Sequence, residues 1–221
     1  MDYRHICSAA MLAQHGLQTA HNAANNVGFD KEGLDAAIEA HSLRQILFRY
    51  IMLEIANVAD VAGISRTLYK DHPELATMHS ELSKAFEFFK YIRNKYVGHL
   101  VPDLTAKTFE WQPHAYTTLG KEESGQPLLL SWWVLETVIN TYTDPSSGHK
   151  IFEGETDLNY PPDQDRFLNF LGETVVKSLK YTTRLIEVTV EKVEIPDLEN
   201  DWVQLAIKAG KTEFEYLAKK R

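Results

Sequence analysis

The residues best suited to chemistry stand together at positions 90–99, where the sequence reads Lys-Tyr-Ile-Arg-Asn-Lys-Tyr-Val-Gly-His. A histidine titrates near neutral pH, so His99 can act as a general acid or base. An arginine presents a planar fork of donors that suits phosphate, which is the chemistry expected of Arg93. Asn94 can hydrogen-bond the same phosphate or orient Arg93. Arg93, Asn94 and His99 are therefore the candidate catalytic group.

The spacing of these residues predicts how they are presented. If Phe89 is placed at zero on a helical wheel of about 100° per residue, Arg93 lies about 40° to one side and His99 about 80° to the other. The two residues are also separated by about 9 Å along the axis of an α-helix. Within one helix they do not converge on one phosphate, whereas two antiparallel copies can bring Arg93 of one chain near His99 of the other. The geometry therefore favours a composite site in a homodimer.

The run Arg-Asn-Lys-Tyr-Val-Gly-His-Leu resembles the Arg-x4–6-His motif of the HEPN family (higher eukaryotes and prokaryotes nucleotide-binding domains), and it is most similar to the abortive-infection branch of that family. The resemblance implies a helical bundle that dimerises and, in active members, cleavage of RNA without a metal or another cofactor. It assigns catalysis to Arg93, Asn94 and His99. Lys90 and Lys95, which lie farther round the helix, are then expected to bind RNA or phosphate.

The resemblance also implies a biological setting, a bacterial defence or toxin–antitoxin system in which an antitoxin or another protein is a partner. It covers residues 31–100 most clearly. Gly98 stands where alanine is common in the abortive-infection branch, and the segment after Pro102 has no counterpart in the family pattern. These two departures bear on activity more than on fold.

A structural interpretation of the same residues stays open. Arg93 can pair with a carboxylate, and His99 can cap the end of a helix, where a cation is favoured. The chain would then be a non-catalytic helical dimer that binds a nucleotide or a protein partner. A metal-dependent enzyme is disfavoured, because His72 and His79 lack a ligand motif with a carboxylate.

The elements that must position these residues are helices. Apolar residues recur at helical spacing, and Glu54 falls within one such repeat, of residues 43–61. Expected helices cover residues 3–25, 31–68, 73–100, 128–142, 163–194 and 197–220. Gly63 is expected to interrupt the second helix, and Asp71 is a candidate cap for the third.

These helices predict an all-α fold, an antiparallel bundle with a small strand or hairpin between about residues 101 and 142. Residues 108–111 alternate weakly and are the candidate strand. A single domain is expected over residues 1–221, with its core at about 31–100 and 163–221 and a decoration at about 101–162.

Composition limits the class of protein. Hydrophobic residues make up 44% of the 221 residues, enough for a sizeable core, and the net charge of −8 excludes a broad phosphate-binding surface. Cys7 is the one cysteine, so neither an internal disulfide nor a thiolate metal cluster can form. The sequence contains neither a signal-peptide pattern nor an apolar run of the roughly 18 residues that a membrane span needs. A cytoplasmic protein without membrane attachment is the expectation.

Overall fold

The computed structural model describes residues 2–28, 33–99, 101–121 and 125–212. Every regular element in these ranges is helical, which confirms the all-α class. The α-helices are α1 (Tyr3–Asn25), α2 (Leu34–Ser65), α3 (Pro73–Ile92), α4 (Pro102–Trp111), α5 (Gly125–Thr141), α6 (Pro161–Val190) and α7 (Leu198–Gly210). Two 3-10 turns, η1 (Arg66–Lys70) and η3 (Pro113–Thr118), and one π-turn, η2 (Arg93–Val97), complete the order. None of the described helices combines the length and the apolar character that crossing a bilayer requires.

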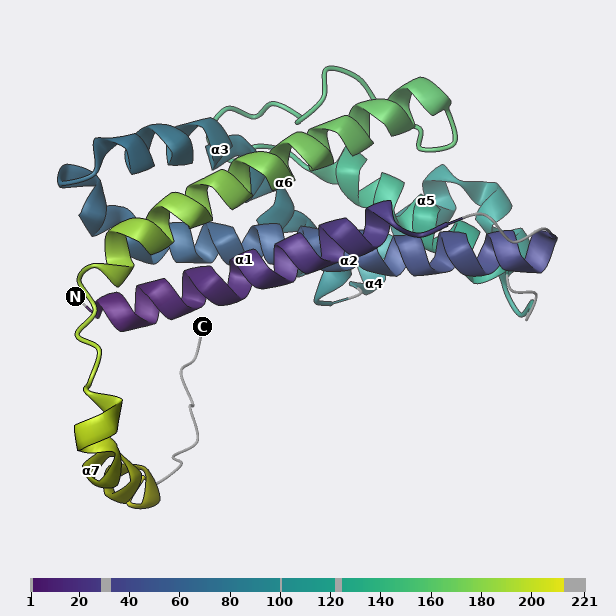
Figure 1. Ribbon diagram of the computed structural model, residues 1–221. Helices are drawn as coiled ribbons and strands as arrows, with labels where there is room; N and C mark the ends of the chain where they lie inside the picture. The colour runs from purple at the N-terminus through teal and green to yellow at the C-terminus, as the bar shows by residue number, and fades with distance from the viewer. Residues whose placement is uncertain (1, 29–32, 100, 122–124, 213–221) are drawn as a thin grey trace.

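Four helices, α1, α2, α3 and α6, pack on one another as a bundle (Figure 1). α1 begins where the carboxylate of Asp2 accepts hydrogen bonds from the backbone N–H groups of Arg4 and His5, an N-cap that stabilises a helix start. Its inner face is apolar and mostly small, which lets it approach α2 and α6 closely. The buried residues of α1 are Ile6, Cys7, Ala10, Ala13, Leu17, Ala20 and Ala24.

Aromatic side chains fill the space between α3 and α6. Phe88 and Phe89 of α3 and Phe167 of α6 are completely buried. The rings of Phe88 and Phe89 stand edge-to-face with their centroids 5.1 Å apart, and Phe170 stacks on Phe89 at 5.8 Å. Such pairs stabilise a core beyond the area that they bury. This packing fixes the C-terminal half of α3, which leads directly into the candidate catalytic residues.

The helix α5 packs on α4 and also contacts α2 and η2. Its buried polar side chains hold the connection that leads to α6. Asn140 makes two hydrogen bonds to the backbone of Thr156, of 2.7 and 2.8 Å. Glu136 accepts a 2.9 Å hydrogen bond from the backbone N–H of Leu158 and another from the side-chain amide of Gln112. The connection between α5 and α6 is therefore tied to α5 well before α6 begins.

The strand or hairpin expected between about residues 101 and 142 is wrong, because the described residues of that segment form helices and turns and include no strand. Residues 108–111 lie in α4, whose first turn has the favourable Pro102 and Asp103. The hydroxyl of Thr108 bonds the carbonyl of Leu104 at 2.9 Å and Thr137 of α5 at 3.0 Å, so its burial reflects contact with a helix. The helix expected over residues 128–142 is confirmed as α5.

Other expected boundaries shift by a few residues. α1 has the expected limits, whereas α2 ends at Ser65 and continues as η1. Gly63 lies within α2 and does not interrupt it. Asp71 does not cap α3, because the N-cap position belongs to His72, which makes no side-chain capping bond.

The last helix, α7, lies apart from the bundle (Figure 1). Asp197 caps its start by accepting hydrogen bonds from the backbone N–H groups of Glu199 and Asn200. The helix ends at Gly210, and Trp202 on its surface is 61% exposed. The expected continuation over residues 213–220 lies outside the described residues.

Candidate active site at the end of the third helix

The chain leaves the α-helical path at Arg93. α3 ends at Ile92, and Arg93–Val97 form a single π-turn that closes with a 2.7 Å hydrogen bond from the N–H of Gly98 to the carbonyl of Arg93. A Cβ atom at position 98 would lie 3.1 Å from that carbonyl oxygen, which is a tight contact, so glycine suits the closure. Single π-turns within helices are frequent at functional sites.

Tyr96 holds this π-turn between two other helices. Its ring is buried, and its hydroxyl lies 2.7 Å from the hydroxyl of Ser131 in α5. The guanidinium of Arg49 in α2 lies 4.7 Å from the ring centroid and donates a 3.4 Å hydrogen bond to the Tyr96 carbonyl. Burial raises the pKa of the Tyr96 hydroxyl, so it stays a neutral donor. The position of the turn is therefore set by α2 and α5.

The straight helix expected over residues 73–100 is wrong beyond Ile92. The turn adopts i→i+5 hydrogen bonding, and His99 follows Gly98 outside any helix. The wheel angle expected for His99 and the axial separation from Arg93 therefore do not apply. The chain leaves the α-helical path because the tertiary contacts that bury Tyr96 favour the wider turn over a continued α-helix. The glycine at position 98 favours the same turn.

Arg93 is the best-held residue of the candidate group. Its side chain is 15% exposed, and its Nη1 donates a 2.6 Å hydrogen bond to Oδ2 of Asp60 in α2. Its Nε donates to Oδ1 of Asn94 at 3.3 Å. Nζ of Lys90 lies 3.8 Å from the other oxygen of Asp60. The structure thus brings Arg93 and Lys90 together at Asp60, and Asn94 joins this cluster through Arg93.

The remaining residues of the candidate group stand apart. The side chains of His99 and Lys95 are exposed, and neither makes a hydrogen bond or an ion pair with another residue that the structure describes. His99 does not cap the helix end, because the N–H of Gly98 closes the turn instead. The structural interpretation therefore fits Arg93, which pairs with a carboxylate, and does not fit His99.

A groove lies beside this cluster, between α1 and α2. It has a volume of about 480 Å³ and shares Asp60 with the Arg93 cluster. Its polar lining includes Tyr50, Glu54 and Asn57 of α2 and His15 of α1. The sequence signal for this groove was Glu54, a carboxylate within an apolar repeat. No sequence signal pointed to Asp60 as the partner of Arg93, since the contact joins two helices.

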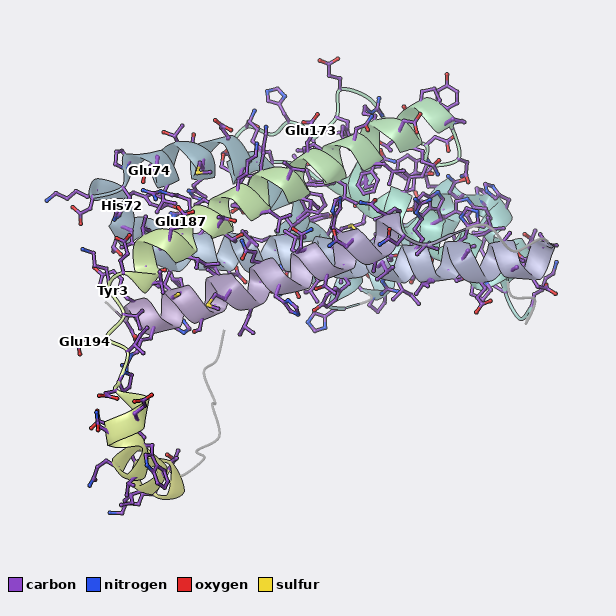
Figure 2. All side chains as sticks on the ribbon, in the orientation of Figure 1. Tyr3, His72, Glu74, Glu173, Glu187 and Glu194 are labelled. Atoms are coloured by element: carbon purple, nitrogen blue, oxygen red, sulfur yellow. The ribbon has the colours of Figure 1, made fainter. Side chains whose placement is uncertain are left out.

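The histidines considered for a metal site lie at the opposite end of α3. His72 lies near Glu74 (Figure 2), with Nδ1 3.6 Å from the carboxylate, and Arg184 of α6 binds that carboxylate at 2.8 Å. His79 packs on the ring of Tyr69 at 5.7 Å, and burial is the main cause that lowers its pKa. Among the residues that the structure describes, no three histidine, cysteine or acidic side chains gather as a metal site would require.

Comparison with known proteins found no family model, no curated protein and no solved structure that matches the chain.

Proposed function

We propose that this chain is an HEPN-like, metal-independent endoribonuclease whose site combines Arg93 and Asn94 of one copy with His99 of a second copy. The observation that carries the proposal is the state of Arg93. Its guanidinium is fixed on two sides by Asp60 and Asn94, whereas Nη2 has no partner among the described residues. A fixed guanidinium with an open donor suits an anion that arrives from outside, because its orientation costs nothing further at the moment of reaction.

The proposed reaction uses the substrate's own ribose. His99 removes the proton from the 2′-hydroxyl, and the oxygen attacks the adjacent phosphorus. Negative charge grows on the phosphate oxygens, where Nη2 of Arg93 donates a hydrogen bond. The bond from phosphorus to the 5′-oxygen breaks, this oxygen takes a proton from a solvent water molecule, and the imidazolium of His99 returns its proton to the solvent. The products are a 2′,3′-cyclic phosphate and a free 5′-hydroxyl, so no metal or other cofactor is needed.

In the proposed dimer, the second chain provides the histidine for the arginine site of the first. His99 lies beyond the π-turn, exposed and without a described partner, so it can reach a neighbouring molecule. In the proposed homodimer, it faces Arg93 of the other copy. Lys90 and Lys95 add positive charge for RNA beside each arginine. A defence or toxin–antitoxin role in the cytoplasm, with an antitoxin as a further protein partner, is part of the same proposal.

One observation favours the non-catalytic alternative. The Arg93–Asp60 pair, at 2.6 Å, is the contact that a purely structural arginine makes. A helical dimer that binds a nucleotide or a protein partner would keep this pair and would have no use for His99 as an acid or base. The two functions therefore differ in the consequence of replacing His99.

The test incubates labelled single-stranded RNA with the protein in EDTA. Wild type should cleave and leave 2′,3′-cyclic phosphate ends, whereas His99→Ala and Arg93→Ala should each lose about 10²–10⁴-fold in rate. Arg93→Lys should fail as well, because a point charge does not replace the fork. Asn94→Ala should be milder, and His149→Ala, which changes an exposed loop histidine, is the matched control.

Sedimentation should give twice the chain mass of 25.3 kDa. RNA that stays intact with wild type, or His99→Ala protein that cleaves as fast as wild type, would overturn the nuclease and leave the non-catalytic alternative.

A further inference from the structure

The groove between α1 and α2 is built around one buried carboxylate. Glu54 is 7% exposed and lines the groove. Oε2 accepts a 3.1 Å hydrogen bond from the side-chain amide of Asn57. A hydrogen bond to Glu54 raises the pKa of the Tyr50 hydroxyl, so this phenol stays protonated as a donor. Two neutral groups thus orient the carboxylate from its own helix.

α1 leaves room for this carboxylate. A Cβ atom on Gly16 would lie 2.8 Å from Cδ of Glu54. Only glycine at this position therefore lets α1 pack against α2 without displacing the Glu54 side chain. Within the described chain, no lysine, arginine or histidine forms an ion pair with Glu54. A buried carboxylate without a cation is costly, since the charge loses its hydration without an opposite charge in exchange. Its open lone pairs therefore suit a ligand that brings N–H donors.

The shape of the groove narrows the class of ligand. Its volume of about 480 Å³ lies in the range of small-molecule sites. Leu12 of α1 is 73% exposed and Tyr50 of α2 is 44% exposed, so both helices offer apolar surface beside the buried carboxylate. Flat apolar faces with a polar edge are the features of a nucleobase, which proteins bind by stacking and by hydrogen bonds to the edge.

The donor pattern selects one base. The Watson–Crick edge of guanine carries two adjacent donors, N1–H and the N2 amino group, which can face one carboxylate. It also carries the O6 acceptor, which the Asn57 amide can reach with its second proton. Adenine and cytosine each offer one amino donor on this edge, and uracil offers one N–H between two carbonyls that a carboxylate repels. Glu54 and Asn57 therefore match guanine better than the other bases.

The groove also lies at a suitable distance from Arg93. Glu54, Asn57 and Asp60 follow one another every third residue on α2, so Glu54 and Asp60 are about 9 Å apart along the axis. Asp60 binds Arg93 directly. A ligand with its base at Glu54 and its phosphate at Arg93 needs to span one nucleotide.

We propose that the α1–α2 groove is a guanine-binding site, in which Glu54 and Asn57 read the base edge of a nucleotide whose phosphate meets Arg93. The extension to RNA rests on the proposed nuclease function, and it predicts that cleavage occurs next to guanosine. The base site itself does not depend on cleavage, since it lies in the fold of one chain.

Binding is tested by titrating the full chain with GMP, AMP, CMP and UMP and following amide NMR shifts. GMP should bind at least tenfold more tightly than UMP, and Glu54→Gln should remove this preference. Glu81→Gln, which changes an exposed carboxylate of α3, is the matched control and should bind as wild type does. Leu12→Glu is the second variant: it leaves the core intact, places a negative charge at an exposed groove residue, and should weaken GMP binding.

The outcomes separate the two proposals. If GMP binds through Glu54 while RNA stays intact, the guanine site stands and the nuclease fails. If RNA is cleaved without preference for guanosine, and Glu54→Gln cleaves with the same pattern, the nuclease stands and the guanine site is overturned. A third result also overturns it: no nucleotide binds, and N-acetyl-arginine amide shifts the same amides in a Glu54-dependent way. The groove would then be a site for a basic protein side chain.

Discussion

The two halves of the candidate active site differ in how the chain holds them. Arg93 is 15% exposed, tied to Asp60 and Asn94, and carried on a turn that Tyr96 fixes. His99 is exposed and follows the turn without a hydrogen bond or an ion pair in the described residues. Arg93, a side chain that the folding of one chain positions, is held by contacts on several sides. Pre-organisation of a site can therefore be divided: folding positions the arginine half and, in our proposal, dimer assembly positions the histidine half.

The largest effect is expected from complementation between two inactive proteins. Arg93→Ala protein retains His99, and His99→Ala protein retains Arg93. If each site combines the two chains, a mixed dimer has one intact site, and random exchange makes half of the dimers mixed, so the mixture should recover roughly a quarter of the wild-type rate. The measurement is RNA cleavage after the two proteins are mixed and equilibrated. A mixture as inactive as its components would show that each chain uses its own arginine and histidine.

The second prediction compares the stability that each residue contributes. Arg93→Ala removes two hydrogen bonds at a largely buried side chain and leaves Asp60 without its main partner. We expect a loss of about 1–2 kcal/mol, discounted because Asp60 is half exposed. His99→Ala should change stability by less than about 0.5 kcal/mol, as exposed substitutions usually do. Urea unfolding of both variants provides the measurement. Equal losses would mean that His99 has a structural contact of its own.

The third prediction concerns the support that α5 gives to the arginine half through Ser131 and Tyr96. Burial raises the pKa of Glu136 in α5 above its ordinary value, although the N–H of Leu158 and the amide of Gln112 partly oppose this. The folded chain therefore holds the Glu136 proton more tightly than the unfolded chain does. This stabilisation is complete below the ordinary pKa and is lost as pH rises through the raised pKa.

The stability of Glu136→Gln, taken relative to wild type, should accordingly increase as pH rises from about 4 to about 7. Thermal unfolding at several pH values measures this difference. Glu153→Gln, which changes an exposed carboxylate in the same connection, should show no such trend. A flat difference for Glu136→Gln would mean that the proton on Glu136 does not contribute to the stability of α5.

A small effect is expected at Gly98, which separates the two halves. Its φ of −84° is accessible to alanine, so the substitution gains stability by restricting the unfolded chain. The new Cβ would lie 3.1 Å from the Arg93 carbonyl, a backbone atom that the π-turn bond holds in place. We expect the contact to outweigh the gain and Gly98→Ala to cost roughly 0.5–1 kcal/mol. A stabilised Gly98→Ala protein would show that the turn is free to widen.

The sequence was sufficient for most of the fold because the long helices carry their own signals. α1 matches its expected limits, and α5 is helical despite its β-branched and aromatic residues. The error over residues 108–111 arose because a short amphipathic helix, α4, offers too few turns for its period to separate from alternation. Helix ends shifted where a 3-10 turn or an exposed linker replaced the last turn.

The candidate site was less predictable for a different reason. The residues at positions 93–99 were identifiable from their types, whereas the π-turn depends on contacts of Tyr96 with α2 and α5. Asp60 lies 33 positions before Arg93, and no local pattern links them. Glu54 occupies a position of an apolar repeat, but its burial under Gly16 is a property of how two helices cross. Long-range contacts of this kind determine the site and leave little trace in a local pattern.

The pairing of Asn140 with Thr156 has a consequence for chain entropy. Within the segment whose ends Asn140 and Thr156 join, backbone bonds from the Asp144 N–H to the His149 carbonyl and from the Gly148 N–H to the Asp144 carbonyl already close the short turn. Lengthening such a loop is inexpensive, since each doubling costs only about 0.6 kcal/mol. The Ser146–Ser147 junction is therefore a suitable place to insert a fluorescent or affinity domain, at a distance in sequence from both Arg93 and the α1–α2 groove.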